Sequence, residues 1–273
     1  MVRLFGPLVG LFFAVALLWS FGNGAYVAIT EPAAPTAEHE FHLHPKEVHF
    51  ASDGAFGKFD KAQLQRGFQV YKEVCSTCHS LKHVAFRDLA ALGYSEAEVK
   101  AIAKEWGAKQ PTFDPKSGER GERDNIPSDY FPTVYYAGQG NPPDLSLITK
   151  ARHDGGAYVH SLLTGYQEQP AELLKKFPDA KTPDGLYYNP YFANLNLAMP
   201  APLSGDGQVT YSDGTKATVD QMATDVSAFL IWTAEPKLDK RKQTGWAVLG
   251  FLLVATVLAY LAKKNVWADK KGE

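Results

Sequence analysis

The chain has 273 residues, of which 45% are hydrophobic and 21% charged, and its formal net charge is -2. This length suits one substantial domain with appendages, and the composition is that of an ordinary folded protein. The slightly negative charge argues against nucleic acid as a partner. Because Cys75 and Cys78 are the only cysteines, no disulfide can join distant segments of the chain.

The first 24 residues carry a single charge, Arg3, followed by an apolar run from Leu4 to Phe21 and a cluster of small residues. A basic residue ahead of such a run is typical of a signal peptide. The run is long for a cleaved segment, so residues 1–24 are predicted to be either a signal peptide or a retained N-terminal hydrophobic helix. In both cases the chain that follows is expected to be translocated to the other side of the membrane.

Residues 25–55 are rich in proline and show little periodic apolar pattern, which predicts an extended linker. The segment also holds four histidines: His39, His42, His44 and His49. Nothing in the sequence fixes their relative geometry, so they are interpreted as solvated loop residues and not as a dedicated metal site.

Apolar residues recur at helical spacing between Asp60 and Val74, predicting a helix that leads into the two cysteines. Gly67 interrupts this helix at some cost in propensity, which favours close packing of a second helix there. The expected partner begins at Thr218, the first residue of a capping box, and stops before Pro236.

Two further helices are expected, one over residues 96–106 behind a capping box of Ser95 and Glu98, and a shorter one over residues 156–163. The stretches 111–143 and 181–214 are rich in proline and glycine and are predicted to be loops. The fold class is therefore mainly α, with long loops.

The motif Cys75-Ser-Thr-Cys78-His79 carries the chemistry of this sequence. Two thiols on one turn can each reach one vinyl group of the same porphyrin, and the following imidazole can then bind its iron. This spacing is typical of covalent attachment of a c-type haem, with His79 as one axial ligand. One haem c is the predicted cofactor.

Two other interpretations of the motif are weaker. A zinc site needs further ligands, and the chain has no other cysteine. A thioredoxin-like dithiol would suit the two cysteines, but no strand-rich βαβ pattern precedes them.

The second axial ligand must come from elsewhere in the chain, which contains three methionines. Met1 is the initiator, and Met222 lies on the apolar face of the late helix, where a core role is expected. Met199 is favoured because the prolines around it limit backbone freedom and can hold a thioether in place. The alternatives are His83, His153 and His160.

Residues 243–262 carry no charge and are long enough to cross the hydrocarbon core, at about 1.5 Å per residue. Trp246, Tyr260 and Trp267 lie near the ends of this run, as interfacial aromatic residues do. Residues 237–273 are therefore predicted to be a transmembrane anchor with a short cytoplasmic tail. Basic residues are balanced on its two sides, so the haem motif decides the orientation: haem attachment takes place outside the cytoplasmic membrane.

Several blocks in order along nearly the whole chain carry a resemblance to a known family. They are Arg66–Tyr71 leading into the haem motif, Asp129–Pro132, Pro142–Ser146, Ala151–His153, Ser161–Tyr166, Tyr187–Phe192, Ala198–Pro200, Asp225–Trp232 and Ala234–Pro236. With these blocks the sequence resembles bacterial cytochrome c1, the haem subunit of the quinol:cytochrome c reductase complex.

The resemblance implies that residues 56–236 form a cytochrome c-like haem domain. It implies His79 and Met199 as the axial ligands of the iron. It also implies that Arg152 and Tyr158 approach the haem propionates, which suits a guanidinium and a phenol facing carboxylates. No residue is expected to be catalytic.

The function implied is that of an electron-transfer subunit and not of an enzyme on its own. The haem would pass single electrons from a Rieske iron–sulfur protein to cytochrome c, beside cytochrome b in a dimeric complex that supports respiratory proton translocation. The haem domain would lie in the periplasm, held by one C-terminal anchor in the bacterial inner membrane. The alternatives are a haem subunit of a terminal oxidase or nitric oxide reductase, and a haem sensor with an open iron site.

Docking of a basic cytochrome c would need an acidic surface. Residues 204–225 contain four aspartates and one lysine, and this stretch is the predicted docking region. The aspartates are Asp206, Asp213, Asp220 and Asp225.

Overall fold

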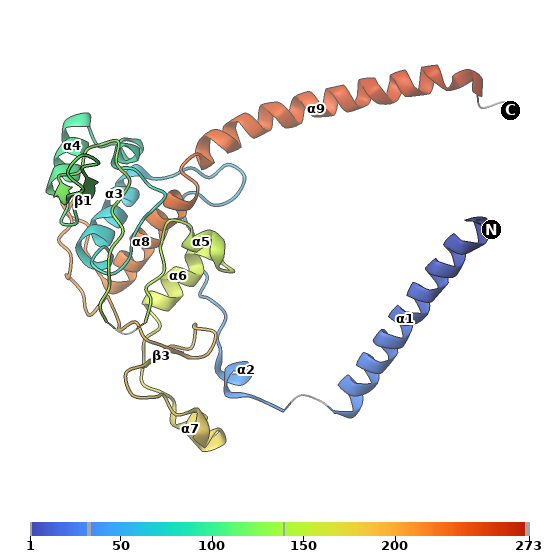
Figure 1. Ribbon diagram of the computed structural model, residues 1–273, viewed down its shortest axis with the longest axis horizontal. Coiled ribbons are helices and arrows are strands. Elements are labelled where there is room, and N and C mark those ends of the chain that lie inside the picture. Colours follow the sequence, from blue (N-terminus) through green and yellow to red (C-terminus); the bar gives the residue numbers. More distant parts are fainter. Residues whose placement is uncertain (1, 32–33, 139, 271–273) are drawn as a thin grey trace.

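A computed structural model describes residues 2–31, 34–138 and 140–270 (Figure 1). Met1, residues 32–33 of the predicted linker and residues 271–273 of the predicted tail lie outside this part. The fold is mainly α, as predicted. The elements are α1 (Val2–Thr30), α2 (Ala37–Phe41), α3 (Lys61–Val70), α4 (Glu96–Glu105), β1 (Gln110–Phe113), β2 (Arg120–Arg123), α5 (Ile148–Ala151), α6 (Gly155–Leu163), α7 (Ala171–Lys176), β3 (Tyr187–Tyr188), β4 (Asn196–Leu197), α8 (Val219–Ala234) and α9 (Leu238–Val266).

The crossing of α3 and α8 forms the centre of the domain. Gly67 lies at the crossing, where an added β carbon would come within 2.0 Å of the carbonyl oxygen of Asp225. The predicted reason for this glycine is thereby confirmed: the two backbones approach too closely for any side chain. Arg66, the neighbouring residue, bonds the buried carboxylate of Asp225 through Nε at 2.9 Å.

Aromatic side chains fill the core around this crossing. Phe68 and Tyr71 extend from α3 and its continuation toward Trp106, Phe131 and Phe229, with ring centroids 5.6 to 6.4 Å apart. Such aromatic pairs stabilise the folded state by more than their buried area alone accounts for. The helix that carries the cysteines is therefore anchored on its inner face.

The predicted helix starts are confirmed. Asp60 caps α3 through the N–H groups of Ala62 and Gln63, and Ser95 and Glu98 form the reciprocal capping box of α4. Thr218 accepts from the N–H of Gln221 at the start of α8.

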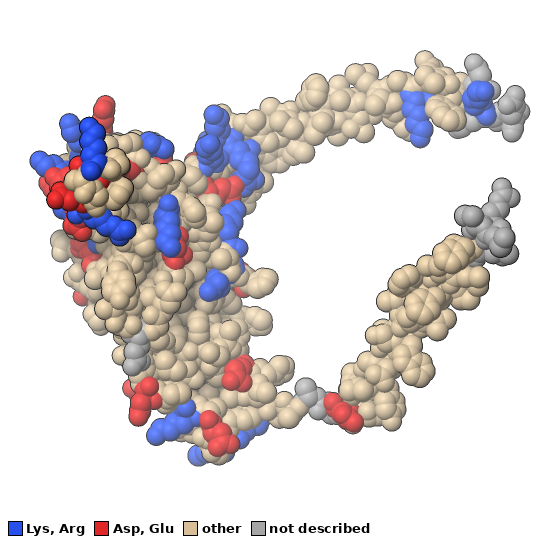
Figure 2. Space-filling model, in the orientation of Figure 1, with Lys and Arg blue, Asp and Glu red and all other residues tan. Residues whose placement is uncertain are grey.

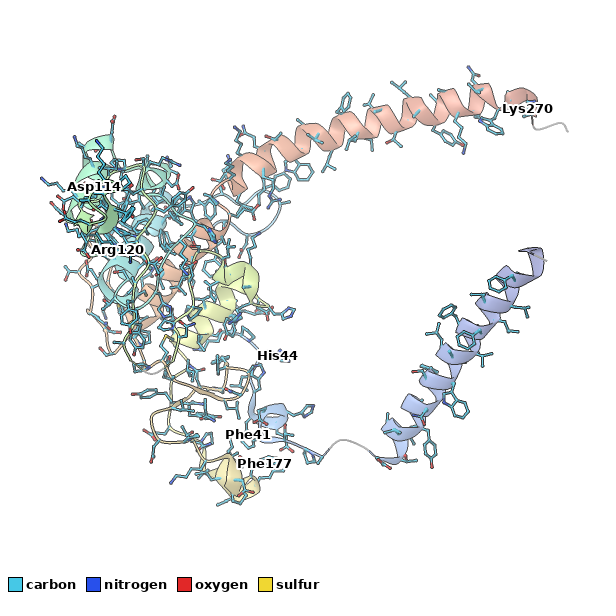
Figure 3. The ribbon with its side chains drawn as sticks, viewed as in Figure 1. Phe41, His44, Asp114, Arg120, Phe177 and Lys270 are labelled. Carbon is cyan, nitrogen blue, oxygen red and sulfur yellow. The ribbon has the colours of Figure 1, made fainter. Side chains whose placement is uncertain are left out.

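The sequence predicted that the stretch 111–143 is all loop, and this is wrong. The stretch contains most of the antiparallel hairpin of β1 and β2. Every residue of β2 is exposed, so no alternation of apolar and polar residues marks the strand. Asp114 and Arg120 lie at the tip of this hairpin, away from the core (Figure 3). A second pairing, β3 with β4, spans two residues in each strand.

The segment 25–55 is less extended than predicted. Residues 25–30 continue α1, and Phe50 belongs to the main core. Lys46 joins the segment to α6, with its N–H donating to Ser161 Oγ at 2.8 Å. Phe41 of α2 and Phe177, which follows α7, meet edge to face in a smaller cluster (Figure 3). The divisions of the chain at residues 24, 55 and 236 stay predictions.

Two helices in the described chain are long and apolar enough to cross a membrane, by length and composition. They cover residues 5–30 and 238–266, and neither buries this surface against the domain. Both project from the compact part (Figure 1), and the charged side chains of α9 gather near its two ends (Figure 2). The C-terminal helix has the properties predicted for the anchor.

Candidate functional site

The cysteine motif begins where α3 widens into a single π-helical turn over Tyr71–Cys75. The N–H groups of Cys78 and His79 both donate to the carbonyl oxygen of Cys75, at 3.1 and 2.9 Å. This turn brings two free, partly buried thiols and one imidazole into one short segment. The structure thus brings together the three residues that the sequence predicted as one unit.

The environment of Cys75 argues against a reactive dithiol. Burial raises the pKa of the Cys75 thiol to about 12, and the neighbouring Cys78 adds to this effect. Redox-active cysteines in such motifs have a lowered pKa, because the thiolate is the nucleophile. Structural attachment therefore suits this pair better than thiol–disulfide exchange.

The imidazole of His79 is oriented by a backbone carbonyl. Its Nδ1 lies 2.8 Å from the carbonyl oxygen of Pro143. A carbonyl can only accept, so Nδ1 carries the proton and Nε2 is left as the basic nitrogen. Burial lowers the pKa of His79, and the bond to Pro143 opposes this in part. A neutral imidazole held in this way is prepared to bind a metal through Nε2.

The backbone of His79 is held from the core side. The hydroxyl of Tyr71 donates to the carbonyl oxygen of His79 at 2.9 Å. Tyr71 is fully buried, and burial raises the pKa of its phenol, so it stays a donor.

Residues 140–146 form a loop that is tied to the segment after the motif. The N–H of Leu145 donates to the carbonyl oxygen of Ser80 at 2.9 Å, and Asp144 accepts from the N–H of Lys82 at 2.8 Å. These bonds fix the loop whose Pro143 carbonyl orients His79.

The same loop also reaches the segment of Met199. A β carbon on Gly140 would lie 3.4 Å from that of Ala198, the residue before Met199. The hydroxyl of Tyr166 donates to the carbonyl oxygen of Met199 at 3.1 Å. The segments of His79 and Met199, 120 residues apart in the chain, thus both contact residues 140–143.

The alternative ligands have other environments. Met222 is fully buried in the core, as predicted. His160 is buried too, with Nε2 bonded to Asp220 at 2.9 Å. His83 and His153 are exposed. Met199 is partly buried, and its place as sixth ligand stays a prediction.

Arg152 and Tyr158 lie on either side of the start of α6. Arg152 is exposed, and its Nη1 donates to the carbonyl oxygen of Ala151 at 3.1 Å. Tyr158 packs against the main core. It lies near Tyr166, whose pKa is raised first by burial and then by Tyr158. Contact of these two residues with haem propionates stays a prediction.

The predicted acidic docking stretch is largely engaged within the domain. Asp225 is fully buried beside Arg66, and Asp213 bonds the same guanidinium at 2.8 Å. Asp206 accepts from the N–H of Val219 at the start of α8. Asp206, Asp213 and Asp220 stay exposed, the last with 79% of its side chain, so folding removes only Asp225 from the surface and pairs Asp213 with Arg66.

Comparison with known proteins identifies the family. The model of the Cytochrome C1 family matches residues 50–270. The chain belongs to the cytochrome c1 family. Cytochrome c1 of Rhodospirillum rubrum is 42% identical over 256 residues, covering 88% of this chain and 92% of that protein. Cytochrome c1 of Cereibacter sphaeroides is 39% identical, covering 84% of this chain and 89% of that protein.

A third relative is longer. Cytochrome b/c1 of Bradyrhizobium diazoefficiens is 46% identical over 239 residues, which cover 79% of this chain and 34% of that protein. This chain therefore spans about a third of the length of that relative.

The cofactor of the cytochrome c1 family is a covalently attached c-type haem. The donor set found here fits it: two free thiols on one turn, an imidazole with Nε2 unprotonated, and a methionine segment reached by the same loop. Soft sulfur and imidazole are the ligands that haem iron accepts in cytochromes c.

Three positioning groups of this family member had no predicted role: the carbonyl of Pro143, the hydroxyl of Tyr71 and the hydroxyl of Tyr166. All three lie in the blocks that carried the resemblance. Their residue types gave no sign of their function, because each acts on the backbone or side chain of a partner 8 to 64 residues away.

Proposed function

We propose that this chain is the electron-transfer haem subunit of a membrane-bound quinol:cytochrome c reductase. When bound, haem c supplies the transfer of single electrons, here from a Rieske iron–sulfur protein to a cytochrome c. The chain is not an enzyme on its own, since it contributes one step to the reaction of the complex.

One observation carries the proposal. Residues 140–143 contact both the imidazole of His79 and the residue before Met199. This arrangement supports axial ligation by both side chains, which leaves no iron position open to a substrate. A closed iron site suits electron transfer and is unsuited to ligand sensing or oxygen chemistry.

The residues of the site would hold the haem and orient the side chains that bind its iron. Cys75 and Cys78 would hold the haem covalently, and His79 and Met199 would bind its iron. The Pro143 carbonyl keeps the His79 ring in one tautomer, and Tyr71 and Tyr166 hold the backbones of the two ligands. A rigid pair of ligands would lower the reorganisation energy of electron transfer, because the ligands move little when the charge of the iron changes. Arg152 and Tyr158 are proposed to bind the propionates.

The names of two relatives and the properties of α9 support the proposed assembly. Proteins from Candida albicans and Saccharomyces cerevisiae, 41% identical to this chain, are named as a cytochrome b-c1 complex catalytic subunit and as mitochondrial cytochrome c1. We assign this chain to the corresponding dimeric complex with cytochrome b, Rieske protein and cytochrome c. Its α9 anchors it in the inner membrane of a bacterium, with the haem domain in the periplasm.

Purification from membranes through a tag on the C-terminus tests this assignment. We expect cytochrome b and a Rieske centre to co-purify, and the preparation to reduce cytochrome c with quinol. The intact mass of the chain should show one haem and the fate of residues 1–24. Carbon monoxide binding to the ferrous chain, or co-purification with oxidase subunits in place of cytochrome b, would contradict the proposal.

A further inference from the structure

A short loop of residues 51–59, here called the foot loop, is clamped to the base of α9. The ammonium of Lys242 donates to the carbonyl oxygens of Ser52 and Gly57, at 2.5 and 3.3 Å. Asp239 accepts from the N–H of Phe59 at 3.2 Å. These bonds join segments 180 to 190 residues apart and tie the foot loop to the base of α9.

An aromatic pair lies beyond this clamp. The ring of Phe56 stacks on that of Trp246, with centroids 5.0 Å apart and planes inclined by 7°. Phe56 is 80% exposed and Trp246 50% exposed, so the pair is open to its surroundings. A phenylalanine presented this way is unfavourable in water, because its apolar surface stays hydrated.

The position of Trp246 along α9 gives the depth of this pair. Trp246 follows Lys242 by four residues, about 6 Å along the helix axis, and the uncharged run starts at Gln243. Headgroup regions occupy roughly 5 to 8 Å on each side of the hydrocarbon core. Trp246 therefore lies at the inner edge of the headgroup region, next to the hydrocarbon core, where tryptophan is enriched. Phe56, stacked beside it, lies at the same depth.

Basic residues slightly outnumber acidic ones around the pair: they are Lys58, Lys237, Lys240, Arg241 and Lys242, against Asp53, Asp60, Glu235 and Asp239. Lys58, Lys237 and Lys240 are exposed, and within the described residues no carboxylate forms an ion pair with them. Lysine and arginine gather where α9 leaves the domain (Figure 2). A patch of this charge next to a bilayer attracts anionic headgroups.

We propose that the foot loop is a second membrane contact, in which Phe56 inserts beside Trp246 at the headgroup level of an anionic phospholipid bilayer. The proposal rests on α9 spanning the membrane and is independent of the redox partners. Because Asp60, which directly follows the foot loop, caps α3, and α3 leads to the haem cysteines, this contact sets the height and tilt of the haem domain above the bilayer.

Site-directed spin labelling of the full-length, haem-loaded chain in phosphatidylcholine–phosphatidylglycerol vesicles tests this contact. Thioether bonds to haem occupy Cys75 and Cys78, so Phe56→Cys introduces the single free thiol. Ala55→Cys labels the same loop with the aromatic stack intact. Phe113→Cys, on the hairpin away from α9, gives an aqueous reference, and Val254→Cys, midway along α9, gives a hydrocarbon reference; both native side chains are well exposed.

Power saturation with oxygen and with a water-soluble nickel chelate, in the diamagnetic ferrous state, reports the depth of each label. We expect the oxygen-to-nickel accessibility ratio at residues 55 and 56 to lie between those of the two references. Ratios equal to that of residue 113 at both positions would overturn the proposal. So would labels protected from both reagents, which indicate protein cover, or an aqueous ratio at residue 254, which would show that α9 does not span the bilayer.

Discussion

Gly67 of α3 packs directly on the backbone of Asp225 in α8, with no room for a side chain between them. The added methyl group of Gly67→Ala would lie 2.0 Å from a carbonyl oxygen and 2.7 Å from Cβ of Phe229, so the helices must separate. We expect a loss of about 3 kcal/mol, or roughly 10 °C in Tm. Thermal unfolding of the haem-loaded chain measures this effect.

Gly107→Ala is the matched control, because its β carbon would meet no atom within 4 Å. Its Tm should equal or slightly exceed that of the parent chain. Equal Tm values for the two variants would contradict the close crossing of α3 and α8.

The ion pair of Asp213 with Arg66 predicts an acid-sensitive contribution to stability. The N–H of Thr215 and then the Arg66 guanidinium lower the pKa of Asp213 from 3.8 to about 2. Because the folded-state pKa is the lower one, the contribution is complete above about pH 4 and disappears as pH falls through about 2. The Tm difference between the parent chain and Asp213→Asn should follow this window.

Asp184→Asn serves as the control for this titration, since Asp184 is exposed and makes no hydrogen bond with its side chain in the described structure. The Tm difference between the parent chain and Asp184→Asn should not follow the pH dependence expected for Asp213→Asn between pH 5 and pH 2. A difference for Asp213→Asn that persists unchanged at low pH would refute the assignment.

Substitution of Met199 tests the axial pair. Met199→Leu keeps the side-chain volume but removes the sulfur, so the long-wavelength sulfur-to-iron charge-transfer band of the oxidised spectrum should vanish. Met222→Leu, in the buried core, should keep the band and cost less than about 1.5 kcal/mol. An unchanged spectrum in Met199→Leu would direct attention to His83 and His153.

The hydroxyl of Tyr166 is expected to support the Met199 ligand. Tyr166→Phe removes the bond to the Met199 carbonyl oxygen and should lower the stability by about 1 kcal/mol, or roughly 3 °C in Tm. A freer methionine loop should also let carbon monoxide bind the ferrous Tyr166→Phe chain, whereas the parent chain should not bind it. Tyr135→Phe, at a 90% exposed position, should leave both quantities unchanged.

The sequence alone was informative wherever the determining contact is local. Cys75, Cys78 and His79 share one turn, so their spacing already indicates covalent haem. The caps of α3, α4 and α8 involve residues two or three positions apart, and each helix begins where the pattern predicted. The apolar run of α9 likewise reports its own length and composition.

Other features depend on which loops meet. The hairpin of β1 and β2 lacks an apolar face, so no periodicity marked it. The aspartates of residues 204–225 were interpreted as free acidic surface. Folding places Arg66, from a helix about 150 residues earlier, between Asp213 and Asp225. Charge in the sequence does not show whether a partner neutralises it.

For the haem site, the residues determined the chemistry, and the tertiary structure decided its orientation. The motif identified His79 as a ligand, but the tautomer of its ring depends on the carbonyl of Pro143, 64 residues away. The Met199 segment passes beside Gly140 in the same loop. The carbonyl of Pro143 carries no residue signature, so only the folded chain could reveal its role.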